Sequence, residues 1–174
     1  GEGIVVTDAK QNILTVNDAF SQVTGFSAEE VIGKTPSVLA SGKHSKDFYL
    51  EMWTHLKSQG WWQGEIWNRR KTGEIYPEWL TVNSVKDQSG NIVNYVGIFS
   101  DITIVKESQR RVEFLATHDE LTSLPNRALF LDRARQAVAR TTRTDSSFAV
   151  LFIDLDNFKE VNDSMGHAAA DDLL

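Results

Sequence analysis

Two aspartates, Asp154 and Asp156, follow a purely apolar run at residues 148–153. A carboxylate at the end of a buried strand can hold a hard cation, because such ions prefer oxygen ligands. A calcium loop beginning at Asp154 would carry an oxygen ligand, Gly and Glu at its fifth, sixth and twelfth positions. The residues found there exclude that loop: Phe158, Lys159 and Met165.

Two polar side chains beyond these aspartates are suited to a nucleobase. Asn162 offers a hydrogen-bond donor and an acceptor, and Asp171 offers acceptors only. Guanine presents adjacent N–H donors on one edge, which a carboxylate accepts, and an amide serves its remaining acceptors. A plain solvated turn explains neither this pattern nor the apolar run before it, so we interpret the region as nucleotide-handling.

Such residues need a sheet edge to position them. The run at 148–153 is typical of a central strand covered on both faces, and open α/β sheets place their ligands at the carboxyl ends of such strands. We expect helices at 127–140 and 158–163, the second closed by Gly166, and a further helix soon after it. One strand and three helices are too little for a domain, and we expect the rest to lie beyond Leu174.

This region resembles the first half of a GGDEF domain, the diguanylate cyclase family. The stretch at 152–163 with Gly166 and His167 is similar to the family's first motif, and residues 119–127 match its entry motif. The family condenses two GTP into cyclic di-GMP at a dimer interface, using Mg²⁺ or Mn²⁺. The resemblance implies an incomplete α/β GGDEF segment, because the signature motif itself is not in the sequence.

The resemblance also implies roles for individual residues. Asp154 would bind metal through its side chain and Leu155 through its carbonyl. Ala170 stands where the family usually has Gly, and its methyl group would crowd the base beside the neighbouring aspartate. Without the second metal-binding acid of the signature, we predict that this chain alone makes no cyclic di-GMP. The implied GTP contacts are Leu121, Asn157, Phe158, Asn162 and Asp171.

The first part of the chain has a different character. All five Trp and all three Tyr lie before residue 100. Ser27 and Glu30 form a capping box, and Ser45 is placed to cap a longer helix that ends at Gly60. The pattern predicts an α+β fold, a five-stranded antiparallel sheet with short helices on one face. The expected strands lie at 3–8, 13–17, 61–70, 75–86 and 92–100.

Residues 1–104 resemble a PAS domain with its PAC motif. The resemblance is carried by five stretches, at 17–20, 24–27, 30–34, 67–73 and 101–103. We therefore divide the chain into a PAS/PAC domain at 1–104, a coiled-coil-like linker helix at 105–117 and a truncated GGDEF segment at 118–174.

PAS domains bind many ligands or none, so the fold does not identify a ligand. Trp53, Trp62 and Asn68 resemble the flavin-contacting stretch of the PAS domain in nitrogen-fixation redox sensors. Trp can stack on an isoalloxazine ring, and an Asn amide can match its polar edge. FAD or FMN is therefore one interpretation, and Trp side chains that simply fill a small core are the other.

Two other types of cofactor-binding PAS domain are not expected. A light-sensing flavin domain of the LOV type needs an adduct-forming Cys, and the chain has no Cys. A haem PAS domain needs a proximal His on the long helix, and neither His44 nor His55 stands at a suitable place.

The linker pattern and the composition indicate which kinds of partner the chain can have. Apolar or small residues at heptad spacing favour a parallel homodimer through the PAS domain and linker over a plain amphipathic connector. The net charge of −6 argues against nucleic-acid binding. We find no signal peptide or membrane-length apolar run, and expect a cytoplasmic protein. The heptad positions are Val105, Ser108, Val112 and Leu115.

Two functions fit these observations. The first is a PAS sensor that controls a diguanylate cyclase, with a helix passing the signal to the output domain. The second is a non-enzymatic ligand-binding or dimerisation module whose output segment is not functional. The sequence does not name the signal, or say whether a phosphodiesterase domain follows.

Overall fold

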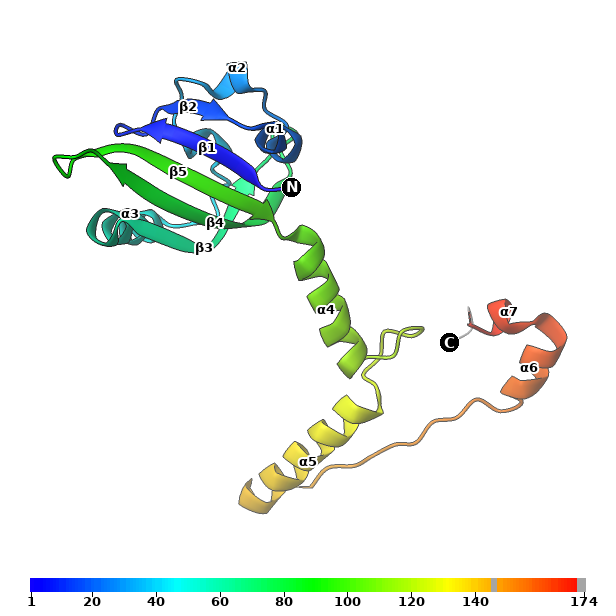
Figure 1. Ribbon diagram of the computed structural model, residues 1–174. Helices are drawn as coiled ribbons and strands as arrows, with labels where there is room; N and C mark the ends of the chain where they lie inside the picture. Colours follow the sequence, from blue (N-terminus) through cyan, green and yellow to red (C-terminus); the bar gives the residue numbers. More distant parts are fainter. Residues whose placement is uncertain (145–146, 172–174) are drawn as a thin grey trace. The chain divides into compact units, whose positions relative to one another are not determined.

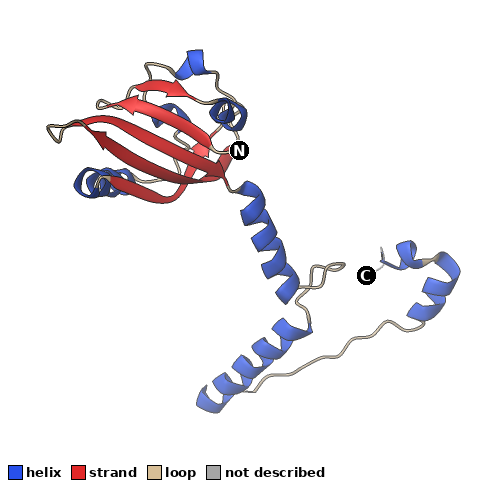
Figure 2. Cartoon of the chain, in the orientation of Figure 1, coloured by secondary structure: helices blue, strands red, loops and turns tan. Residues whose placement is uncertain are grey.

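The computed structural model describes residues 1–144 and 147–171 (Figure 1). The chain separates into two compact units, Gly1–Lys106 and Glu107–Leu174. All strands of the described residues lie in the first unit, and the second is helical with connecting segments (Figure 2). No helix in this described part is long and apolar enough to cross a membrane.

The first unit is built on a five-stranded antiparallel sheet with the strand order β2-β1-β5-β4-β3. The five-stranded antiparallel sheet predicted from the sequence is confirmed. The first two strands form a hairpin whose turn is held by Asp8, because its carboxylate accepts hydrogen bonds from the backbone N–H groups of Lys10 and Asn12. The strands are β1 (Gly3–Asp8), β2 (Ile13–Val16), β3 (Trp61–Arg69), β4 (Ile75–Lys86) and β5 (Ile92–Asp101).

Short helices with well-defined ends connect β2 to β3. Ser27 and Glu30 form the predicted capping box, and the Ser45 hydroxyl accepts from the N–H of Phe48 at the start of the longest of these four helices. That helix ends at Gly60, whose φ of 87° favours glycine. The helices are α1 (Asp18–Thr24), α2 (Ala28–Val31), the 3₁₀ helix η1 (Pro36–Leu39) and α3 (Lys46–Gln59).

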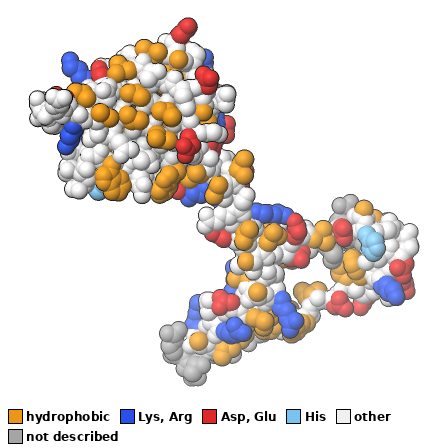
Figure 3. All heavy atoms as spheres, in the orientation of Figure 1, with side chains coloured by type: hydrophobic (Ala, Val, Ile, Leu, Met, Phe, Trp, Pro, Cys, Tyr) orange, Lys and Arg blue, Asp and Glu red, His pale blue; other side chains and the backbone are white. Residues whose placement is uncertain are grey.

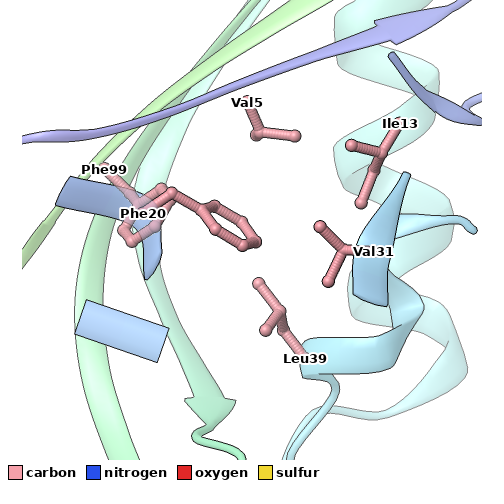
Figure 4. Close-up of a cluster of buried hydrophobic side chains, with 6 residues drawn as sticks. All are labelled: Val5, Ile13, Phe20, Val31, Leu39 and Phe99. Atoms are coloured by element: carbon pink, nitrogen blue, oxygen red, sulfur yellow. The ribbon is translucent and has the colours of Figure 1, made fainter. Parts of the chain in front are cut away.

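These helices bury one face of the sheet. The rings of Phe20 and Phe99 meet edge to face with their centroids 5.8 Å apart. Gly3 is required beside them, because a Cβ at this position would lie 2.3 Å from the Phe99 ring. Figure 4 shows the core side chains pointing toward one another; they are Val5, Ile13, Phe20, Val31, Leu39 and Phe99.

The second unit follows the predicted helices but lacks the predicted strand. The helices are α4 (Thr103–Thr117), which begins in the first unit, α5 (Arg127–Thr144), α6 (Phe158–Met165) and α7 (His167–Asp171). Gly166 closes α6 as expected.

The strand predicted at 148–153 is wrong for this structure. This stretch has no regular structure, and Phe152 and Ile153 are 93% and 87% exposed. A strand needs neighbours that accept and donate its backbone hydrogen bonds. No other described residue of this unit forms a strand that could pair with it.

Candidate functional site

A cavity of 320 Å³ lies inside the first unit. Its walls come from the inner face of the sheet, from α3, and from the segment around η1. Most of the lining is apolar, and Leu39, Ile66 and Phe99 among these residues are themselves buried. The volume lies at the lower end of the ~300–1,000 Å³ that small-molecule pockets span. The cavity is therefore large enough for a small organic ligand.

A buried carboxylate is the most unusual group in this cavity. Glu78 on β4 is only 1% exposed. Asn68 donates from Nδ2 to its Oε1 at 2.8 Å, and the Tyr76 hydroxyl donates to its Oε2 at 2.9 Å. Burial raises the pKa of Glu78 to about 7, although the hydrogen bonds from Tyr76 and Asn68 act in the opposite direction. Glu78 thus changes charge near neutral pH.

Strand pairing explains why these groups meet. β3 and β4 pair with Asn68 opposite Tyr76 and Ile66 opposite Glu78. Side chains alternate between the faces of a strand, so Tyr76 and Glu78 point to the same face. Asn68 shares this face, directly opposite Tyr76 and diagonally across from Glu78. Asn68 and Glu78 line the cavity on this inner face.

A tyrosine from α3 adds a second polar group to the cavity. The Tyr49 hydroxyl is buried, and no described residue of the chain accepts or donates a hydrogen bond to it. Burial, followed by the nearby charge of Glu78, raises the pKa of Tyr49. A buried hydroxyl without a partner costs free energy, about 1–3 kcal/mol. Tyr49 thus lines the cavity and carries a buried hydroxyl whose hydrogen-bond partner is not among the described residues.

Both histidines considered for haem have other surroundings. His44 Nε2 accepts from the backbone N–H of Trp67 at 2.8 Å, its ring stacks on Phe48, and burial lowers its pKa. His55 contacts Trp61 in a separate groove lined by α3 and the start of β3. Neither lines the main cavity.

The structure brings together two of the three residues predicted to contact a flavin. Trp53 and Asn68 line the cavity, and the Trp53 ring meets Tyr95 edge to face. Trp62 lies instead in the groove beside His55 and packs against Phe48.

Sequence reasoning missed the two other polar groups of the cavity. Glu78 could have been found from the alternation of β4, because it shares the inward face with Tyr76 and Leu80. No sequence signal distinguishes Tyr49, since its helix carries aromatic residues on more than one side.

A chain of contacts links the cavity to the start of α4. The Arg70 guanidinium lies over the Tyr76 ring, 3.9 Å from its centroid, and forms an ion pair with Asp101. Asp101 also accepts hydrogen bonds from the N–H and hydroxyl of Thr103, at 2.8 and 2.6 Å. Burial opposes the charge of Asp101, but the bonds from Thr103 and Arg70 outweigh it and lower its pKa.

The residues expected to bind GTP and metal are spread along the second unit. Leu121 is half exposed in the turn after α4. Asn157 caps α6 in the left-handed conformation, with φ of 58°, and Asn162 Oδ1 lies 3.0 Å from His167 Nδ1. The others are Asp154, Leu155 and Asp171, which are exposed, and Phe158, which is half-buried.

These residues do not form a metal site in the described part of the chain. No group of three or more His, Asp or Glu side chains comes together there. Asp154 and the Leu155 carbonyl are oxygen ligands of the right kind for Mg²⁺ or Mn²⁺. The described residues do not place further acidic or His side chains around them. We therefore derive no catalytic step through a metal.

A five-stranded antiparallel sheet that encloses a ligand-sized cavity, and whose last strand leads into a helix, is the architecture of a PAS-type sensory domain. The chain belongs to the PAS domain family, whose model matches residues 1–103, and residues 116–174 match the family described as diguanylate cyclase, GGDEF domain. Both resemblances drawn from the sequence motifs are confirmed.

Individual relatives support the same two families. The chain is 29% identical over 177 residues to a probable diguanylate cyclase of Escherichia coli K12, a match over 100% of this chain and 16% of that protein. It is 28% identical over 137 residues to a nitrogen fixation regulatory protein of Klebsiella oxytoca, over 78% of this chain and 28% of that protein. The chain thus spans less than a third of either relative.

Among solved structures, the chain resembles the PAS domain of a protein from Colwellia psychrerythraea. The TM-score is 0.56 and the identity 28%, covering 59% of this chain and 86% of the other.

Proposed function

We propose that this chain is the sensor and the beginning of the output domain of a cyclic di-GMP signalling protein. In this protein the PAS cavity would control a diguanylate cyclase that joins two GTP molecules. The observation that carries the proposal is the presence of a PAS domain at 1–103 and a GGDEF match at 116–174 in one chain, joined by α4. The proposal includes the division into a PAS/PAC domain at 1–104, a linker helix at 105–117 and a GGDEF segment at 118–174.

In the complete cyclase, Asp154 and the Leu155 carbonyl would hold Mg²⁺ or Mn²⁺. Two copies would associate through the PAS domains and α4, whose apolar positions Val105 and Val112 are 64% and 66% exposed. The GTP contacts would be Leu121, Asn157, Phe158, Asn162 and Asp171.

FAD or FMN is a candidate ligand of the PAS cavity. It is supported by Trp53 and Asn68, which line the cavity together, and it does not involve Trp62. The visible spectrum of the freshly purified chain tests this assignment. A structured flavin band is expected if it is correct, and a featureless spectrum would refute a tightly held flavin.

The test of the proposed function uses the natural protein that carries this chain, incubated with GTP and Mg²⁺. We expect cyclic di-GMP, and we expect Asp154→Asn to reduce its rate at least a hundredfold, because the metal loses a charged ligand. Glu160→Gln, on the exposed surface of α6, is the matched control and should keep full activity. No product from the wild-type protein would refute the proposal.

A second candidate is a ligand-binding or dimerisation module without enzymatic activity. The observation that favours it is Ala170, which stands where the cyclase family usually has Gly beside the guanine-reading Asp171. Replacement of Ala170 by Gly in the natural protein separates the two candidates. Activity that appears only in this variant would identify a decayed output domain, and activity already present in the wild type would exclude one.

A further inference from the structure

The groove between α3 and the start of β3 is shaped by the turn that joins them. Only Gly60 separates the end of the helix from the strand, and its carbonyl accepts from the N–H and the hydroxyl of Ser84 on β4. The turn therefore holds one side of α3 beside the first residues of β3. Residues three and four apart share a side of a helix, and this side presents Phe48, Glu51 and His55 to the groove.

Aromatic rings line the groove in two pairs, each joining α3 to β3. The His55 and Trp61 rings meet at 85° with their centroids 5.5 Å apart. The Phe48 and Trp62 rings meet at 88° with their centroids 6.1 Å apart. The Trp62 ring also lies against its own strand, because a Cβ on Gly64 would be 2.9 Å from it. The rings thus form corners instead of one flat wall, and Trp61 is 45% exposed to solvent.

One carboxylate gives this groove its charge. Glu51 is exposed, and no Lys or Arg is among the described residues that line the groove. An anion would be repelled both by Glu51 and by the negative faces of the aromatic rings. A hard metal ion takes about six oxygen ligands, and no group of three His, Asp or Glu side chains comes together in the described part of the chain. The groove therefore suits an organic cation.

The walls also distinguish between organic cations. A primary ammonium is a strongly hydrated point charge, and a guanidinium is a planar group that stacks on a single ring face. Neither matches an open groove in which rings meet at right angles. A quaternary ammonium has no N–H donor to satisfy, and its methyl groups carry positive charge onto aromatic rings. The same methyl groups can pack against the apolar side chain of Met52.

We propose that the groove between α3 and β3 binds a small molecule with a quaternary ammonium group, whose methyl groups contact the Trp61 and Trp62 rings and whose charge lies near Glu51. This site is distinct from the main PAS cavity, because Met52 is the one residue that lines both. The inference does not rest on the proposed control of a cyclase.

Choline is the probe, and its control is the uncharged analogue in which carbon replaces the quaternary nitrogen. Each is titrated into the isotope-labelled chain of 174 residues, and NMR spectra follow the indole N–H signals of its five Trp. Trp61 and Trp62 report on the groove, and Trp53 reports on the main cavity. We expect choline to shift the first two signals and not the third. The uncharged analogue should bind about fivefold more weakly or worse, because it lacks the cation–π attraction.

Two matched pairs of variants locate the site. Trp61→Leu keeps an apolar side chain but removes the ring, and should weaken choline binding by about fivefold or more. Trp79→Leu makes the same change at a tryptophan that is 47% exposed and does not line the groove, so the affinity should not change. Glu51→Gln should weaken binding about twofold to fivefold, as expected for one exposed charge. Glu29→Gln removes an exposed carboxylate of α2 instead and should have no effect.

Several results would overturn the proposal. Equal affinities for choline and its uncharged analogue would show that the charge is not recognised. Shifts at Trp53 without shifts at Trp61 and Trp62 would place the cation in the main cavity, and unshifted signals throughout would mean that it does not bind. Ethanolamine, a primary ammonium, binding as tightly as choline would refute the role of the methyl groups. All of these readouts measure binding alone, so they are separate from the test of cyclic di-GMP synthesis.

Discussion

Glu78 is a carboxylate that the fold places where its charge is disfavoured. Burial raises its pKa from 4.5 to about 7 and outweighs the two hydrogen bonds and the nearby Arg70, which lower it. Its conservative replacement by Gln keeps the shape and removes the titration. The Gln variant therefore tests directly whether Glu78 titrates near neutral pH.

The raised pKa has a definite sign for stability. Between pH 4.5 and 7 the folded state holds the Glu78 proton more tightly than the unfolded state, so the free energy of unfolding falls as pH rises. The stabilisation is fully present below pH 4.5 and lost as pH passes 7, and it amounts to about 3 kcal/mol. We expect wild-type protein to lose this much relative to Glu78→Gln, measured by urea unfolding at pH 4.5 and 8.

The difference between the two proteins isolates Glu78, because the other carboxylates titrate in both. Tyr76, Tyr49, Arg70 and Asp101 are the titratable groups that interact with Glu78, and they are unchanged in the variant. Parallel pH profiles for the two proteins would show that Glu78 is not the buried, neutral-pH acid described here.

Gly3 is a second residue whose identity is imposed by packing. A Cβ there would lie 2.3 Å from the Phe99 ring. We expect Gly3→Ala to lower the free energy of unfolding by about 1–3 kcal/mol, the usual cost of overpacking a core. Gly1→Ala is the matched control, because its Cβ would lie at an ordinary 3.6 Å from Ala19. Equal urea midpoints for the two variants would contradict this account.

At the scale of elements, the junction of β5 and α4 is held by one carboxylate. Asp101 accepts from Thr103 at the start of the helix and pairs with Arg70, which in turn covers the Tyr76 ring. Tyr76 donates to Glu78 in the cavity. A change in the charge or contacts of Glu78 is thereby connected, through neighbouring side chains, to the first turn of α4.

Removal of Asp101 should loosen that first turn. We expect Asp101→Ala to lower the free energy of unfolding by about 2 kcal/mol, because the partly buried Arg70 keeps only the exposed Glu74 as an ion-pair partner and Thr103 loses two hydrogen bonds. Hydrogen exchange at residues 103–106 should become at least tenfold faster. In the natural protein, cyclic di-GMP synthesis should lose its response to the PAS ligand.

Asp87→Ala is the control for this prediction. Asp87 also organises a turn by accepting from the N–H groups of Ser89 and Asn91, but that turn is far along the sheet from α4. Unchanged exchange at residues 103–106 in Asp101→Ala would show that Asp101 does not hold the start of the helix.

At the scale of the whole molecule, the two units differ in how far they bury their apolar side chains. The first encloses its core between the sheet and helices, and Figure 3 shows hydrophobic side chains mixed with polar ones on its surface. In the second unit, the apolar run at 148–153 is largely exposed, with Leu151 at 78% and Phe152 at 93%.

We therefore expect backbone hydrogen exchange at 148–153 to be complete within seconds in the isolated chain. β5, whose residues pair on both sides, should stay protected for hours under the same conditions. Mass spectrometry of peptides from both regions in one sample makes the comparison. Exchange at 148–153 as slow as in β5 would mean that this stretch is paired after all.

Local sequence determined much of this protein. The capping box at Ser27, the cap at Ser45 and the glycine after α3 mark helix ends through contacts within a few residues, so they could be predicted without knowing the fold. The strands of the PAS domain were predictable as well, because runs of strand-favouring residues and the polar turns between them are features of the local sequence.

Only the tertiary structure decided which side chains face the cavity. Trp53 and Trp62 look alike in the sequence, yet one lines the cavity and the other lies in a groove beside α3. The Tyr49 hydroxyl, which has no partner among the described residues, and the buried carboxyl group of Glu78 depend on distant elements coming together. The run at 148–153 shows that local sequence alone does not decide whether a strand forms. Its residues favour a strand, but a strand exists only where a second one supplies its hydrogen bonds.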